Sequence, residues 1–254
     1  MVVDQFKRRL RSRPLAYGFA RAGWRALRTT RRRARSIGAP VRAAIRALRA
    51  YRRERSERAE QVAAWIRAGR PAPAPPAVKQ RIVADQGKLS GADCLIETGT
   101  YRGDMVFAQR RRFRRIFTIE LDDHLFERAV KRFRAEGHIV VLHGDSGQVL
   151  PTLLESIRWP CLFWLDGHFS GGVTARGDLE TPVVLELEAI LRHRIPGHVV
   201  LIDDARCFGA GDYPSIDALR RQVVAARPDW SLDVRDDVIR IHGPVVEPAV
   251  AGAR

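Results

Sequence analysis

The chain has 254 residues, of which 45% are hydrophobic, enough for one domain of ordinary size plus an extension. Its formal charge of +16 lies entirely in residues 1–70, which hold 21 Lys and Arg against 4 Asp and Glu. The three cysteines lack C-x-x-C spacing, and no apolar run approaches the roughly 18–20 residues of a membrane span. These features argue against a disulfide framework, a cysteine zinc site and a membrane span. We therefore expect a cytoplasmic protein, and leave open a peripheral place at a membrane surface.

Residues 1–70 are predicted to form an Arg-rich helical extension, interrupted at Gly38-Ala-Pro40. Three interpretations of its charge remain open: a solvated or partly disordered tail, a surface for nucleic acid or anionic lipid, and a helix that docks a partner. The proline-rich composition of residues 71–77 predicts a stiff linker. The remaining residues, 78–254, are expected to form one catalytic domain.

Beyond a helix near 78–89, apolar runs alternate with amphipathic stretches, as in a doubly wound α/β domain. Five strand–helix repeats are followed by two strands joined by a short polar turn. The predicted strands span 93–97, 116–120, 138–142, 161–166, 198–203, 230–234 and 238–242, and the intervening helices span 103–112, 123–136, 146–156, 182–193 and 215–226. The fold class predicted is therefore Rossmann-like α/β, mostly parallel with a C-terminal antiparallel hairpin.

The first predicted strand ends in the turn Glu97-Thr-Gly99-Thr100-Tyr-Arg-Gly103. Glycine lacks a Cβ, so backbone at Gly99 and Gly103 can approach a ligand closely. The spacing matches neither G-x-G-x-x-G nor a phosphate-binding P-loop. A strand–turn–helix unit of this kind binds its ligand outside the carboxyl end of the strand.

A carboxylate closely follows each of the first five predicted strands. One such acid alone is more often a structural cap than a functional group, but five on one sheet edge favour a ligand crevice. The five acids are Glu97, Glu120, Asp145, Asp166 and Asp203.

The order of these motifs resembles the Rossmann-like S-adenosylmethionine-dependent methyltransferases, and in particular the small metal-dependent O-methyltransferases of the catechol and bacterial sugar types. The resemblance covers roughly residues 80–245. It implies a bound S-adenosylmethionine, with Glu120 on the ribose hydroxyls and Asp145 with Ser146 at the adenine. It also places the first turn at the methionine part of the donor. The donor-binding residues implied are Glu97, Gly99, Thr100, Gly103, Glu120, Asp145, Ser146 and Asp166.

The same resemblance implies a Mg²⁺ site at Asp166, Asp203 and Asp204. Carboxylates are the hard oxygen ligands that Mg²⁺ prefers, and a bound metal can ease deprotonation of a substrate hydroxyl. The alternative is an exposed Asp203-Asp204 pair that caps a loop. Asp166 and His168 are the catalytic candidates, His168 as a general base because imidazole titrates near neutral pH. A metal-held hydroxyl can also react without a base, in which case His168 is a surface residue.

These observations predict Mg²⁺-dependent O-methylation of a small hydroxylated acceptor such as a sugar. One alternative is an RNA methyltransferase that holds its substrate with the basic segment. Another is a non-catalytic membrane-surface or scaffold protein. The sequence leaves open whether the chain forms a homo-oligomer.

Overall fold

The computed structural model describes residues 41–46, 48–50, 52–167 and 182–244, and the chain divides into two compact units, 1–60 and 61–254. The described part of the first unit is helical and almost wholly exposed. Its ion pairs are one helical turn apart, as in Arg53–Glu57 at 2.7 Å and Arg58–Glu54 at 2.6 Å. Such pairs support an isolated solvated helix. None of the described helices is long and apolar enough to cross a membrane.

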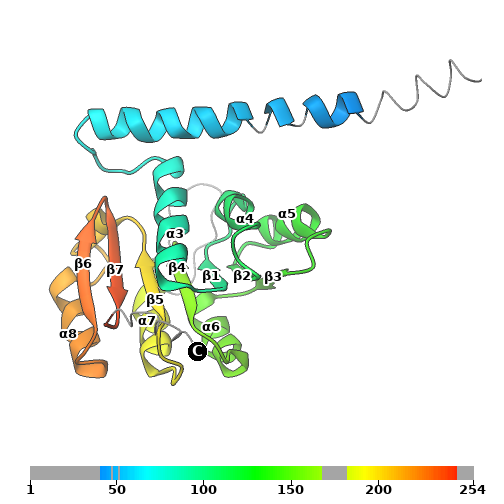
Figure 1. The fold of residues 1–254 in the computed structure, drawn as a ribbon. Coiled ribbons are helices and arrows are strands. Elements are labelled where there is room, and N and C mark those ends of the chain that lie inside the picture. The colour runs from blue at the N-terminus through cyan, green and yellow to red at the C-terminus, as the bar shows by residue number, and fades with distance from the viewer. Residues whose placement is uncertain (1–40, 47, 51, 168–181, 245–254) are drawn as a thin grey trace, which may run out of the picture. The chain divides into compact units, whose positions relative to one another are not determined.

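The second unit contains a seven-stranded sheet in the order β3-β2-β1-β4-β5-β7-β6 (Figure 1). The strands are β1 (Cys94–Thr98), β2 (Arg115–Glu120), β3 (Ile139–His143), β4 (Cys161–Leu165), β5 (Val199–Ile202), β6 (Ser231–Arg235) and β7 (Val238–His242). Strands β1 to β5 are parallel, whereas β7 runs antiparallel to both β5 and β6. The predicted Rossmann-like sheet with a C-terminal antiparallel hairpin is confirmed.

Helices cover both faces of this sheet (Figure 1). The helices are α3 (Pro76–Ser90), α4 (Asp104–Gln109), α5 (Asp123–Phe133), α6 (Ser146–Ser156), α7 (Val183–Arg192) and α8 (Ile216–Ala226). Along β4, Leu162 and Trp164 pack in the core that contains α3 and α4, while Phe163 and Leu165 pack in the core that contains α6 and α7. Because both faces are covered, the central strands are continuously apolar rather than alternating.

The chain reverses direction around the sheet between β1 and β4, which are direct neighbours. From β1 the chain winds outward to β2 and β3, and from β4 it winds the other way to β5. This switch point is where open α/β sheets bind their ligands, outside the carboxyl ends of the strands.

Two boundaries differ from the sequence prediction in ways that matter for the site. Helix α4 ends at Gln109 rather than at 112, because the chain turns there and the Arg112 N–H donates to the Gln109 carbonyl at 2.7 Å. Helix α3 begins at Pro76, inside the predicted linker, since proline fits the first turn of a helix. Trp65, which precedes that linker, is buried, and its indole N–H donates to the Pro71 carbonyl at 2.8 Å.

Candidate functional site

The turn after β1 lies directly against the backbone that follows β4. Gly99 has φ +79°, and a Cβ there would lie 2.5 Å from the Asp166 carbonyl oxygen. Gly103 has φ +74° and precedes the first residue of α4, where a Cβ would lie 2.8 Å from the Phe133 ring. Both predicted glycines are therefore required by their backbone conformation and by the lack of space for a Cβ. Gly99 lies where the turn after β1 packs against the backbone after β4.

Glu97 is buried in β1 and bonded to a hydroxyl group of the neighbouring strand. It is 2% exposed, and its Oε2 accepts a hydrogen bond of 2.6 Å from the Thr118 hydroxyl on β2. The Thr118 hydroxyl is also 2.5 Å from that of Thr100. Burial raises the pKa of Glu97 well above its usual range, and the nearby Asp166 and Glu120 carboxylates raise it further. The hydrogen bond from Thr118 acts in the opposite direction and lowers the pKa.

Glu120 connects the end of β2 with the turn after β1. Its Oε2 accepts from the Tyr101 N–H at 2.7 Å, and its Oε1 accepts from the Asp122 N–H at 3.0 Å. Burial raises its pKa, although these backbone hydrogen bonds act in the opposite direction. A carboxylate has about four lone-pair sites, so both oxygens can still accept hydroxyl groups of a ligand.

Asp145 and Ser146 lie at the start of α6. The Asp145 side chain accepts a hydrogen bond of 2.8 Å from the Gly147 N–H, and so caps the helix. Ser146 is buried at the first helical position. Asp145 therefore has a structural role, which is compatible with a contact to a ligand through its second oxygen.

Thr98, Ser146 and Glu186 form a buried polar group around Gly167 that the sequence did not predict. Each of these side chains has an oxygen 3.3–3.4 Å from the position that a Cβ on Gly167 would occupy. Glu186, on α7, is 1% exposed, and burial together with the Asp145 charge raises its pKa to about 7. Among the described residues, Glu186 Oε1 and Thr98 Oγ1 have no hydrogen-bond partner.

A signal for Glu186 was present in the sequence. It lies three residues after Val183 and four before Ile190, both buried, and thus on the apolar stripe of its helix. An acid at such a position is expected to be buried and to have a raised pKa.

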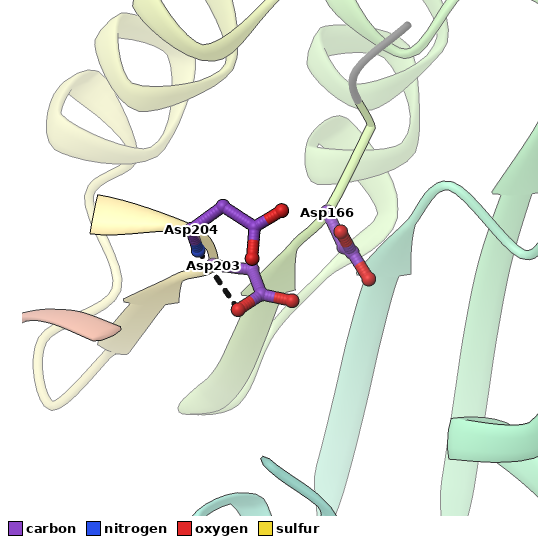
Figure 2. A group of neighbouring side chains, drawn as sticks. All are labelled: Asp166, Asp203 and Asp204. Atoms are coloured by element: carbon purple, nitrogen blue, oxygen red, sulfur yellow. Dashed lines mark hydrogen bonds between the residues drawn. The ribbon is translucent and has the colours of Figure 1, made fainter. Parts of the chain in front are cut away.

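Asp166, Asp203 and Asp204 come together at the carboxyl ends of β4 and β5 (Figure 2). One ligand oxygen of each lies within 4.8 Å of the others. The Asp204 N–H donates to Asp203 Oδ1 at 2.8 Å. Asp204 has φ +55°, a backbone conformation that residues other than glycine adopt infrequently. Strained backbone of this kind is concentrated at functional sites.

Two cations contact this acidic cluster. The Lys79 Nζ from α3 lies 2.5 Å from Asp203 Oδ2 and 2.9 Å from Asp204 Oδ1, and Arg206 Nη1 lies 2.8 Å from Asp204 Oδ1. Burial raises the pKa of Asp203 to about 6; Lys79 lowers it and Asp204 raises it further. Sequence reasoning missed Lys79, because nothing local connects it with aspartates more than 120 positions further along the chain.

Even with these two basic residues in contact, the three carboxylates fit a hard divalent cation. Three carboxylates from two adjacent strand ends supply oxygen ligands only, which is the ligand type that Mg²⁺ selects. His168, the predicted general base, lies outside the described residues, whereas Asp166 is described and half-buried.

No protein-family model and no curated protein matches this chain. Among solved structures, the chain is similar to an O-methyltransferase from Bacillus cereus in complex with SAH, with 17% identity, a TM-score of 0.49, and coverage of 73% of this chain and 89% of that one. It is similar to the O-methyltransferase TomG from Streptomyces achromogenes, involved in tomaymycin synthesis and in complex with SAM, with 20% identity, a TM-score of 0.49, and coverage of 72% and 87%.

A third similar structure is a putative O-methyltransferase from Klebsiella pneumoniae, with 19% identity, a TM-score of 0.46, and coverage of 72% of this chain and 87% of that one. These are similarities of fold. The activity proposed below rests on the residues of the chain itself.

Proposed function

We propose that this chain is an S-adenosylmethionine-dependent O-methyltransferase that acts on a small hydroxylated acceptor, such as a sugar, with Mg²⁺ as its metal. The observation that carries the proposal is that four carboxylates lie at the carboxyl ends of neighbouring parallel strands. Glu97 and Glu120 lie within the last two residues of β1 and β2, and Asp166 and Asp203 directly follow β4 and β5, around the switch point between β1 and β4. Such strand ends are where an open α/β sheet binds a nucleotide-like ligand.

On this proposal the turn after β1 and the Glu120 carboxylate hold the donor. Glu120 accepts the ribose diol, and its bond to the Tyr101 N–H keeps the turn in place. The backbone at Gly99 lies beside the methionine part, where a side chain would obstruct the approach. Asp145 and Ser146 lie at the adenine end, next to the first turn of α6.

The acceptor lies on the other side of the switch point, over Asp166, Asp203 and Asp204. These residues would hold Mg²⁺, which supplies Lewis-acid stabilisation of the acceptor hydroxyl in its deprotonated form. Fixing that oxygen in line with the sulfonium methyl group lowers the barrier chiefly through proximity and orientation. The sugar class of acceptor comes from the resemblance of the Asp203-Asp204 pair to the sugar O-methyltransferases.

Calorimetric titration of the full chain with S-adenosylmethionine and S-adenosylhomocysteine tests the donor part of the proposal. We expect both to bind at a single site, and an intact fold that binds neither would refute it. Transfer of a labelled methyl group to hydroxylated sugars, compared with transfer to RNA, tests the acceptor. Labelled RNA together with unlabelled sugars would favour the alternative activity that uses the basic segment.

A further inference from the structure

Lys79 has no place in the proposed reaction, yet its contact with Asp203, at 2.5 Å, is shorter than that of Arg206 with Asp204, at 2.8 Å. Its ammonium group lies within 2.9 Å of oxygens from both Asp203 and Asp204, two of the three residues assigned to the metal. The Asp203 side chain is only 1% exposed and that of Lys79 is 17% exposed, so water screens these contacts little. Contacts of this length between buried charges are a specific structural feature rather than a surface ion pair.

The adjacent aspartates need a positive charge close by. Two neighbouring carboxylates repel each other, and a buried charge without a partner is strongly destabilising. The Lys79 ammonium group supplies this charge, since its Nζ lies 2.5 Å from Asp203 Oδ2 and 2.9 Å from Asp204 Oδ1. Lys79 and Arg206 therefore together offset the negative charge of the pair when no metal ion is bound.

A divalent cation would use the same oxygens. Mg²⁺ requires its ligands at about 2.0–2.1 Å in a near-octahedral arrangement, which brings it into the space beside Asp203 and Asp204 that the ammonium group fills. Two cations at one carboxylate pair also repel each other. Of the two basic residues, Lys79 is the one able to leave, because lysine is a compact charge on a flexible stem. Arg206 is fixed by a second ion pair, to Asp237.

We propose that the Lys79 ammonium is the resident counter-ion of the Asp203-Asp204 pair, and that a divalent cation binds there only by displacing it. The inference rests on the proposed metal site and extends it, since it makes metal affinity a property set by a residue of α3. In the metal-free protein Lys79 stabilises the site, and in the metal-bound protein its side chain turns out toward solvent.

The competition is tested by measuring Mn²⁺ binding to the full chain through the electron paramagnetic resonance signal of the free ion. The Lys79→Met variant should bind Mn²⁺ at least about tenfold more tightly than the wild type, the scale on which one neighbouring charge shifts an ionic equilibrium. Lys88→Met is the matched control, because Lys88 is an exposed lysine on the same helix, and it should bind as the wild type does. Equal or weaker Mn²⁺ binding by Lys79→Met would overturn the proposal.

Amine labelling of the wild-type protein gives a second measurement that does not depend on a variant folding. Lys79, Lys88 and Lys131 are resolved by mass spectrometry of the labelled peptides, since the chain has only four lysines. Saturating Mn²⁺ should increase the labelling of Lys79 several-fold and leave that of Lys88 and Lys131 unchanged. Labelling of Lys79 that does not respond to bound Mn²⁺ would overturn the displacement.

The same samples distinguish a failure of the competition from a failure of the proposed metal site. If no variant binds Mn²⁺, both the competition and the metal part of the proposed function are wrong. Titration with S-adenosylmethionine then shows whether the donor part stands without a metal.

Discussion

Gly99 lies so close to Asp166 that a Cβ on the glycine would approach the Asp166 carbonyl oxygen to 2.5 Å. The Asp166 N–H in turn donates to the Thr98 carbonyl at 3.1 Å, so the ends of β1 and β4 are joined just where the chain reverses its winding. The turn proposed to bind the methyl donor therefore packs directly against the strand end proposed to bind the metal. A substitution at Gly99 is expected to disturb both sites.

Gly99→Ala should abolish S-adenosylmethionine binding and lower the free energy of unfolding by about 1–3 kcal/mol, through positive φ and overpacking against Asp166. Calorimetry and urea unfolding measure the two effects. Gly137→Ala is the control, because a Cβ on Gly137 meets nothing within 4 Å. If Gly99→Ala binds the donor as the wild type does, the turn after β1 is not part of the donor site.

Glu120→Ala should weaken donor binding by at least about tenfold, since it removes charged hydrogen bonds worth roughly 1.5–3 kcal/mol. It also leaves the Tyr101 N–H in the turn without its acceptor. Glu127→Ala, on the exposed face of α5, provides the control for loss of a carboxylate. Titration of both variants with S-adenosylhomocysteine measures the difference. Equal affinities would remove Glu120 from the donor site.

Asp166→Asn should weaken Mn²⁺ binding at least about tenfold, because a neutral amide replaces one of three charged oxygen ligands. Donor binding should change little, as the backbone contact with Gly99 does not depend on the side chain. Paramagnetic resonance and calorimetry on the same variant check the two halves. Unchanged Mn²⁺ affinity would place the metal elsewhere.

Glu186 should make stability depend on pH. Burial raises the pKa of this carboxyl from 4.5 to about 7, so between these values the folded protein keeps a proton that the unfolded chain releases. The free energy of unfolding should therefore fall as pH rises from about 4.5 to 7, by up to about 1.4 kcal/mol per pH unit, and level off above.

Glu186→Gln should lose this component. Urea unfolding of both proteins at pH 5, 6, 7 and 8 gives the difference between them, in which the contributions of the other carboxyl groups with raised pKa, Glu97, Glu120 and Asp203, cancel. The variant should gain stability relative to the wild type across this range. Parallel curves would show that Glu186 is ionised, or equally protonated, in both states.

Local sequence patterns predict the alternation of strands and helices, the closing hairpin and the position of the acids after the strands. Local periodicity identifies strands and helices, and the carboxyl ends of parallel strands necessarily share one sheet edge. Glu97, Glu120, Asp166 and Asp203 could therefore be placed at the carboxyl ends of neighbouring strands from the sequence alone. The demand for glycine at 99 could also be anticipated from the turn in which it lies.

The groups that contact these acids are set by long-range packing. Lys79 reaches Asp203 because α3 packs across β4 and β5, and Thr98, Ser146 and Glu186 meet around Gly167 because α6 and α7 cover the opposite face. Such contacts join residues far apart in the chain, and no local pattern encodes them. The sequence thus predicts the ligand site at the carboxyl ends of the parallel strands, whereas packing sets the charge balance there and puts the Lys79 ammonium in the space proposed for a metal.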